Sequence, residues 1–231
     1  MSSRSPQALG TMVDARWWGS LSFHQAHERN LEDVQRSAVD GRARLLFFEP
    51  NAPVLTLGRR LHGDRATVLA PTLRRASSRG IEVLEADRGG QATLHLPGQL
   101  VLFVAIPGRR EQIASLLDTI FSAIESLTLA QDVTIRRGDG DATGLWVGSA
   151  KLASAGLRVA EGVIRHGVSL NVAIDRSLVA GLTLCGHQDA RFIDLKTIAE
   201  GAQHHEKVSS HDVARQLCGI LGPYNLLAGE D

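Results

Sequence analysis

Cysteine is scarce in this sequence, which has only Cys185 and Cys218 among its 231 residues. Two cysteines do not form the disulfide framework of a small secreted domain. Charge of one sign is lacking as well: 25 basic residues balance 25 acidic ones, so no global field favours nucleic acid or an anionic membrane as a partner. No apolar run approaches the roughly 18 residues that a membrane-spanning helix requires. The composition therefore indicates an ordinary soluble globular protein.

Sorting signals, linkers and repeats are also missing. The first ten residues are polar and lack the apolar segment of a signal peptide, so we expect a cytoplasmic protein in which a lone thiol stays reduced. No internal repeat and no low-complexity linker divides the chain. We therefore expect a loose leader over residues 1–13 and one single domain over residues 14–231.

Two common kinds of functional site have no counterpart in the sequence. There is no G-x-x-x-x-G-K-[ST] loop, which excludes the simplest nucleoside triphosphatase. Paired C-x-x-C or H-x-x-x-H spacing is lacking, so a zinc site is not indicated by the available side chains, Cys185, His187, His204 and His205. We expect neither a metal nor a cofactor.

What the sequence does contain is a mixture of strand and helix patterns. Helices are predicted at residues 20–39 before Gly41, 71–79 with Pro71 in the first turn, 111–127, and from a Ser209 or Ser210 cap toward Leu221. Strands are predicted at residues 45–48, 54–58, 81–85, 100–106, 145–147, 152–159 and 168–174. A regular βαβ alternation is not present. The predicted fold is therefore α/β of the α+β type, with a mixed, largely antiparallel sheet flanked by helices.

Cys185 is the candidate nucleophile. Gly186 follows it and His187 comes next, so the thiol is expected near a polar loop. A cysteine becomes reactive when a nearby cation or base favours its thiolate, and in an extended segment His187 would point to the same side. The alternative is a buried structural cysteine. We interpret Cys218 in that way, because it lies in an apolar helical pattern.

Lys151 is the candidate partner of that thiol. The residues around it, 148–156, are otherwise small and apolar, so we expect the amine to be desolvated. Desolvation lowers the pKa of a lysine and lets it exchange protons near neutral pH. The alternative is a lysine that extends from the end of a strand into solvent.

A glycine-rich segment from Arg88 to Gln99 precedes both residues. The paired glycines at 89–90 are compatible with a simple hairpin turn. Because Gly98 follows only a few positions later, the segment also fits a backbone that approaches a ligand closely and presents N–H groups to a carbonyl. There His95 would donate to the carbonyl or pack on an acyl chain. A thiol, an amine and a glycine-rich strip in this chain predict acyl transfer through a cysteine thioester.

Arginines are crowded in one part of the chain, namely Arg59, Arg60, Arg65, Arg74, Arg75 and Arg79. They favour either plain solubility or a docking face for an acidic partner. In the second case they would steer the partner and act mainly on its association rate.

These pieces, in their order, match a known family. The chain resembles the lipoyl(octanoyl) transferases, in the biotin/lipoate protein ligase fold group, over about residues 49–199. The resemblance rests on residues 52–59, 87–90, His95, 97–101, 141–148, Lys151, 154–158, His166-Gly167, 170–172 and Cys185-Gly186. Taken alone, His166-Gly167 is equally compatible with a turn.

The resemblance implies the catalytic-domain fold of that group and a specific reaction. Such enzymes move an octanoyl group from acyl carrier protein to a lysine of the lipoyl domains of 2-oxoacid dehydrogenases and of the glycine cleavage H protein. By position, Cys185 would form the acyl-thioester, and Lys151 would lower the pKa of its thiol and relay protons. The residues implied to line the acyl and pantetheine site are Arg88, Gly89, Gly90, Gln91, Ala92, Thr93, Leu94, His95, Ser154, Ala155, Gly156, Gly167, Val168 and Ser169.

The chain departs from the family pattern at three positions. Leu94 and Leu96 flank the histidine where the family usually has an aromatic residue and a glycine, and Leu184 stands where it usually has proline. We expect the Leu96 side chain to narrow or reshape the acyl site. Two other functions stay open: an ATP-dependent ligase for lipoate or biotin, and a non-catalytic relative that binds acylated carriers or lipoyl domains.

Overall fold

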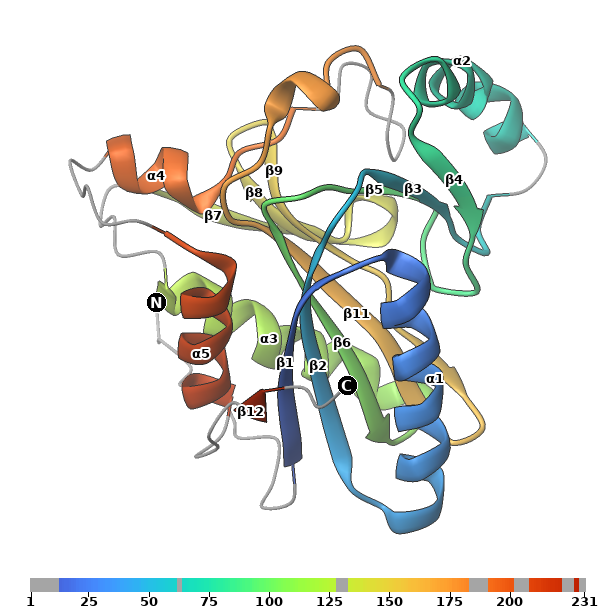
Figure 1. Cartoon of the computed structure of the whole chain (residues 1–231), viewed down its shortest axis with the longest axis vertical. Helices are drawn as coiled ribbons and strands as arrows, with labels where there is room; N and C mark the ends of the chain where they lie inside the picture. Colours follow the sequence, from blue (N-terminus) through green and yellow to red (C-terminus); the bar gives the residue numbers. More distant parts are fainter. Residues whose placement is uncertain are drawn as a thin grey trace.

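The computed structural model describes residues 13–61, 64–127, 133–182, 191–201, 208–221 and 227–228. Its centre is a nine-stranded sheet in the order β12-β1-β2-β6-β11-β9-β8-β7, with β10 paired to β11 (Figure 1). The strands are β1 (Val13–Leu21), β2 (Ala43–Pro50), β6 (Gln99–Pro107), β7 (Ile135–Gly138), β8 (Gly144–Val147), β9 (Ala150–Ala155), β10 (Arg158–Ala160), β11 (Val163–Asn171) and β12 (Leu227–Ala228). Among these described strands, the only parallel pairs are those that β1 forms with β12 and with β2. The predicted largely antiparallel sheet is confirmed.

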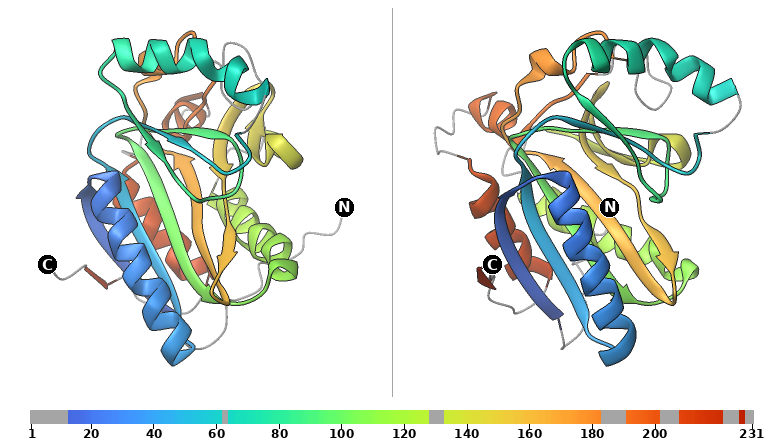
Figure 2. Two further views of the ribbon diagram at one scale, coloured as in Figure 1. Left: turned by 90° about the vertical axis from the view of Figure 1, so that its right-hand side faces the viewer. Right: turned by 45° about the vertical axis from the view of Figure 1, so that its right-hand side comes forward.

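A second sheet of three strands lies at one end of the first (Figure 2). Its middle strand β3 (Val54–Leu57) is parallel to β4 (Glu82–Glu85) and antiparallel to β5 (Ala92–His95). Helix α2 (Asp64–Ser78) lies beside it, and Ala76 of this helix is buried in one cluster with Leu55 of β3. This smaller sheet forms a separate wall above the large one.

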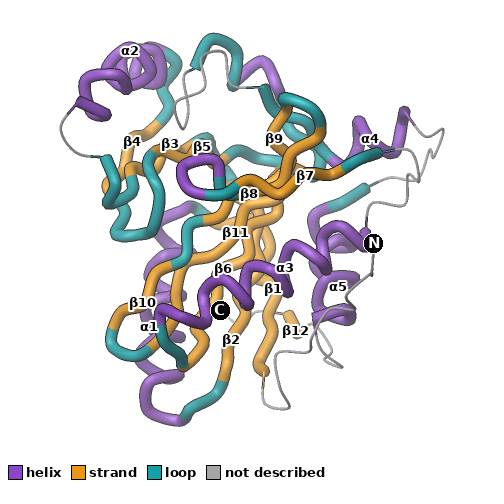
Figure 3. Tube along the Cα trace, turned by 180° about the vertical axis from the view of Figure 1, so that it is seen from behind, coloured by secondary structure: helices purple, strands orange, loops and turns teal. Residues whose placement is uncertain are grey.

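Helices cover both faces of the large sheet, as Figures 2 and 3 show. On one face Phe23 packs with Phe48, and on the other Ile120 packs with Phe47. The neighbours Phe47 and Phe48 fill opposite layers because side chains alternate along a strand. The helices are α1 (Phe23–Asp40) on the first face, α3 (Ile113–Leu127) and α5 (Ser210–Leu221) on the second, and the short α4 (Leu195–Gly201). No described helix has the length and apolar character needed to cross a membrane.

Local capping chemistry sets the ends of α1 and the start of α5. Ser22 and Gln25 form a capping box, in which the Ser22 hydroxyl accepts from the Gln25 backbone N–H. Gly41, at φ 72°, ends the helix as predicted. Ser209 rather than Ser210 caps α5, because its Oγ accepts from the Asp212 N–H at 3.1 Å.

Other predicted boundaries were wrong. α2 begins at Asp64, so Pro71 lies inside the helix instead of in its first turn. The single strand predicted over residues 152–159 is two strands, β9 and β10, that separate at Gly156. β1, β5, β7 and β12 were not predicted at all. Each of them is short or carries polar residues, so its sequence has no strong period of two.

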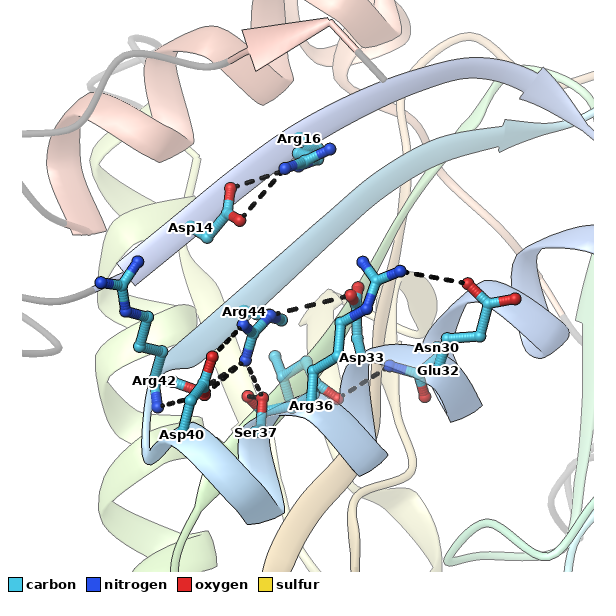
Figure 4. A network of polar contacts seen from close by, with 12 residues as sticks. Asp14, Arg16, Asn30, Glu32, Asp33, Arg36, Ser37, Asp40, Arg42 and Arg44 are labelled. Atoms are coloured by element: carbon cyan, nitrogen blue, oxygen red, sulfur yellow. Dashed lines mark hydrogen bonds and ion pairs between the residues drawn. The ribbon is translucent and has the colours of Figure 1, made fainter. Parts of the chain in front are cut away.

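A polar network joins α1 to β2 (Figure 4). Arg44 donates from Nη2 to Asp40 Oδ2 at 2.5 Å and from Nη1 to Ser37 Oγ at 3.0 Å. Asp33 is less well paired, because its Oδ1 lies 3.9 Å from Arg44 Nε. Burial raises the pKa of Asp33 to about 6, against the opposing effect of Arg44. The fold therefore favours the protonated form of this carboxyl.

We expect Asp33→Asn to remove a pH dependence of stability. Because the folded-state pKa lies above the ordinary value, Asp33 weakens the fold as the pH rises from about 4 to about 6. The cost above that window is on the order of 2 kcal/mol. Urea unfolding of both proteins at pH 4.5 and 7.0 measures this cost: the gain in stability of the variant over the wild type should be clearly larger at pH 7.0 than at pH 4.5. If the free energies of unfolding of the two proteins differed by the same amount at both pH values, the prediction would be contradicted.

Candidate active site

A cleft of about 620 Å³ lies between the two sheets and the start of α3. That volume is in the range of sites for small-molecule and cofactor-sized ligands. Its walls are residues 88–91 with Thr93, Lys151 and residues 154–159 from the region of β9 and β10, and Ile113, Ala114 and Leu117 of α3. The rest of the lining is Arg59, Arg60, Arg110, Gly140 and Thr143.

Lys151 lies in this cleft and is buried, with only 6% of its surface exposed. The alternative of a lysine extending into solvent is therefore wrong. Its Nζ is 5.0 Å from the ring centroid of Trp146, the residue opposite it on β8, in a cation–π arrangement. Gly144 of β8 also leaves room for it, because a Cβ there would lie 2.9 Å from Lys151 Cε.

A β-bulge directs Lys151 toward the cleft. On β8, Leu145 pairs with Ala153 and Trp146 pairs with Lys151, so Leu152 is an extra residue in β9. The extra residue shifts the alternation of side chains by one. Lys151 and Ser154 therefore face the same side and both line the cleft. Strict alternation would have placed them on opposite faces.

Two buried amides hold the backbone of Lys151. Asn171 donates from Nδ2 to the carbonyls of Lys151 at 2.9 Å and Ile193 at 3.0 Å. Gln99 in turn donates to Asn171 Oδ1 at 2.9 Å. The Lys151 N–H donates to the Arg191 carbonyl at 2.8 Å. The segment at 191–193 is thus fastened directly beside Lys151.

The glycine-rich segment is a wall of the cleft and not a hairpin turn. β3 lies between β4 and β5, so these two strands do not pair with each other. The Arg88 side chain is folded inward, where it donates to Thr56 Oγ1 and to the carbonyl of Gln91. Gly89 passes so close to the next wall that a Cβ would lie 2.6 Å from the Leu157 carbonyl oxygen. The close backbone approach expected from the glycines is present.

Asp87, just before this segment, joins three parts of the wall. Its carboxylate accepts from Arg158 and Arg165 and lies 2.7 Å from His166 Nε2. These contacts hold the pKa of Asp87 well below its usual range, with the His166 hydrogen bond as the largest cause. His166 lies inside β11, not in a turn, at φ 63°, and burial lowers its pKa. Asp87 carried no role in the predictions, although it directly precedes Arg88-Gly89-Gly90.

A smaller inner pocket, of about 20 Å³, adjoins the cleft and shares Arg88, Thr93 and residues 154–156 with it. Its other walls include His95 and residues 166–169. Ala92 and Leu94 point to the opposite side of β5, into the core of the smaller sheet. Leu96 is buried in the same core, so the expectation that it narrows the acyl site is wrong.

The structure thus brings most of the predicted site residues together around the two cavities. Those that line one or both are Arg88, Gly89, Gly90, Gln91, Thr93, His95, Lys151, Ser154, Ala155, Gly156, Gly167, Val168 and Ser169. Cys185, His187 and Leu184 lie outside the described residues, and so do His204 and His205. Within the part of the chain that is described, no three His, Cys, Asp or Glu side chains gather in a way that would hold a metal ion.

The crowded arginines fall into two groups: some are bonded to carbonyls of the chain itself, and others are exposed. Arg79 donates to the carbonyls of Leu178 at 3.0 Å and Ala180 at 2.9 Å, and Arg75 donates to the carbonyl of Gly181. These two therefore hold the segment that leads toward Cys185. The Arg65 side chain is outside the described residues. Arg59 and Arg60 are exposed at the cleft, and Arg74 is exposed on α2.

Comparison with known proteins gives one consistent result. The sequence model of a family described as the lipoyl protein ligase A/B catalytic domain matches residues 24–218. An octanoyltransferase of Methylococcus capsulatus is 33% identical over 203 residues, which are 87% of this chain and 92% of that protein. An octanoyltransferase of Magnetococcus marinus is 37% identical over 71% of this chain and 74% of its own length.

Two solved structures share the fold at low sequence identity. A lipoate-protein ligase A bound with ATP superposes with a TM-score of 0.69 at 15% identity, over 94% of this chain and 90% of that one. A biotin protein ligase from Leishmania major in complex with biotinyl-5-AMP gives 0.52 at 13% identity, over 92% and 74%. At such identities the superpositions concern the fold alone.

Proposed function

The chain belongs to the lipoyl protein ligase A/B catalytic domain family, and we propose that it works as an octanoyltransferase through a thioester on Cys185. In the first step the Cys185 thiolate attacks the thioester carbonyl of an octanoyl carrier. The carbon–sulfur bond to the carrier breaks, and the carrier thiolate takes a proton from the Lys151 ammonium. In the second step the acceptor lysine attacks the acyl-enzyme, its proton passes to Lys151, and the Cys185 thiolate leaves.

The observation that carries this proposal is the position of Lys151. It is a buried amine in a cleft of substrate size, and its backbone N–H is bonded to the carbonyl of Arg191. Arg191 follows Cys185 by only six positions, so the chain between them spans at most about 20 Å. On the other side Leu182 is fully buried. The described residues that flank Cys185 in sequence are thus both held in the structure, and the bond from Lys151 to Arg191 supports pairing this amine with Cys185 in the proposal.

Incubation with octanoyl-acyl carrier protein tests the reaction. We expect intact mass spectrometry to show one octanoyl adduct on the enzyme, and then transfer to a lipoyl domain, both without ATP. An ATP-dependent ligase for lipoate or biotin would need ATP for product formation. Binding of the acylated carrier with no adduct and no product would instead indicate a non-catalytic relative.

The partners in this proposal are acyl carrier protein as donor and, as acceptors, the lipoyl domains of 2-oxoacid dehydrogenases and the glycine cleavage H protein. Arg59 and Arg60 support it, because both are exposed at the cleft, where an acidic carrier would present its acyl arm. Arg75 and Arg79 do not, since they donate to the protein's own carbonyls. The proposed docking face therefore leaves out Arg75 and Arg79.

Charge reversal at the cleft tests the docking face. We expect Arg59→Glu with Arg60→Glu to raise the KM for octanoyl-acyl carrier protein about tenfold at low ionic strength, with little change at 0.5 M salt. The KM for octanoyl-pantetheine, which has no acidic protein, should not change. Arg36→Glu is the matched control, because Arg36 does not line the cleft. Equal KM values for the double variant and the control would exclude these two arginines.

A further inference from the structure

A buried tryptophan lies directly against Lys151. Trp146 of β8 is 5% exposed, and it is not part of the cleft lining. Its ring centroid lies 5.0 Å from Lys151 Nζ, within the roughly 6 Å over which a ring face attracts a cation. Among aromatic side chains, tryptophan offers the strongest attraction of this kind. The indole thus contacts the amine without bordering the cleft.

The strand register places three side chains in one row on this part of the sheet. Trp146 is paired with Arg136 of β7 on one side and with Lys151 of β9 on the other. Side chains of directly paired residues lie next to each other on the same face of a sheet. The Arg136 guanidinium carbon is 5.7 Å from the same ring centroid. In this row the indole therefore lies between an exposed guanidinium and a buried amine.

The turn between β7 and β8 fixes the orientation of the indole. Trp146 Nε1 donates to the Ala142 carbonyl at 2.9 Å, and the Ala142 N–H donates in turn to the Asp139 carbonyl at 2.9 Å. Gly138 leaves space for the ring, because a Cβ there would lie 2.7 Å from Trp146 Nε1. The indole is thus held by backbone groups at its polar edge while its ring meets the amine.

The surroundings of the amine are positively charged. Cations near an amine disfavour its ammonium form. The face of an indole carries negative charge density, so it acts in the opposite direction and favours the ammonium where the ring holds it. Among the described residues that line the cleft, every charged side chain is a cation: Arg59, Arg60, Arg88, Arg110, Lys151 and Arg158.

From this geometry we propose that Trp146 is a positioning residue for the reaction, and that its ring keeps the Lys151 ammonium at the cleft. The inference rests on the proposed function, in which that ammonium stabilises the Cys185 thiolate and gives a proton to the leaving carrier thiolate. No bond to Trp146 forms or breaks in either step. Because the ring acts through Lys151 and does not border the cleft, its removal should lower kcat and leave KM nearly unchanged.

Trp146→Leu tests the effect on turnover. Leucine has no ring face for the ammonium, so we expect kcat for octanoyl transfer to fall about tenfold. The KM for octanoyl-acyl carrier protein should change little. Trp18→Leu is the matched control, since Trp18 also carries a cation, with Arg29 Cζ 3.7 Å from its ring centroid, but lines neither cavity. The control should keep the wild-type kcat. Wild-type kcat in Trp146→Leu would overturn the proposal.

Fluorinated tryptophans at position 146 alone separate the charge of the ring from its shape. Fluorine withdraws electron density and weakens the attraction for a cation, while the ring fills nearly the same space. The first step uses the ammonium form of Lys151, so acyl-enzyme formation is lost as the pH rises through the pKa of the amine. We expect this loss to move to lower pH with each added fluorine. The same pH profile for every ring would mean that Trp146 only fills space, and would contradict the proposal.

NMR of the lysine side chains tests the contact itself, without turnover. The chain has three lysines, Lys151, Lys196 and Lys207, so carbon-13 at their Cε atoms gives few signals, which single Lys→Arg variants assign. An indole ring shifts protons above its face upfield. The Lys151 Hε signals should therefore lie upfield of those of the exposed Lys196 and lose that shift in Trp146→Leu.

An unshifted Lys151 signal would overturn the proposal even in an active enzyme. If the wild type transferred no octanoyl group, the proposed function would fail, while the NMR measurement still tested the contact between Lys151 and Trp146.

Discussion

Cys185→Ala is expected to form no acyl-enzyme and to lose octanoyl transfer by at least about 10³-fold, because alanine has no nucleophile with which to accept the acyl group. Intact mass spectrometry after incubation with octanoyl-acyl carrier protein, and the rate of lipoyl-domain modification, measure the two effects. Cys185→Ser should also be strongly impaired, since a hydroxyl is a weaker nucleophile than a thiolate at neutral pH. Transfer by Cys185→Ala at a near-normal rate would show that the covalent mechanism is wrong.

Cys218→Ala is the matched control for that experiment. Cys218 lies on α5, is 1% exposed and packs in the main core. Burial also raises the pKa of its thiol, so it is neither accessible nor ionised at neutral pH. We expect Cys218→Ala to form the adduct at the wild-type rate, with a small loss of stability of about 1 kcal/mol from the shortened core side chain.

Lys151→Ala is expected to lose most turnover, by about 10² to 10⁴-fold, and to raise the pKa of the Cys185 thiol. Both effects have one cause. In the proposed mechanism the ammonium stabilises the thiolate that attacks the carrier, and the same amine accepts the proton of the acceptor lysine in the second step. Without it, the thiol remains largely protonated at pH 7 and the acceptor has no base.

Lys151→Arg separates charge from proton exchange. Arginine keeps a cation beside Trp146, which now lies 5.0 Å from Nζ, but it cannot release a proton. We therefore expect a thiol pKa close to that of the wild type together with a strong loss of the second step. The pH dependence of Cys185 alkylation in the three proteins gives the thiol pKa, and deacylation of the isolated acyl-enzyme gives the second step. An unchanged thiol pKa in Lys151→Ala would assign activation of the thiol to another residue, His187 first.

The sequence by itself determined the elements whose signals are local. α1 ends at Gly41 because a glycine reaches a positive φ without strain, and the apolar stripe over residues 113–127 is helical by its period alone. The mixed order of strands and helices was enough for a largely antiparallel fold. The glycines and small residues around Lys151 correctly indicated close backbone contact and a buried amine.

Only the tertiary structure decided which residues meet. The bulge at Leu152, the three partners of Asp87, and the contacts of Arg75 and Arg79 each depend on segments distant in sequence. Composition shows that an arginine is charged but not whether its partner is another protein or a backbone carbonyl of its own chain. His95 illustrates the same limit. Burial and the nearby charge of Arg88 lower the pKa of His95 to about 3, and no local pattern encodes that environment.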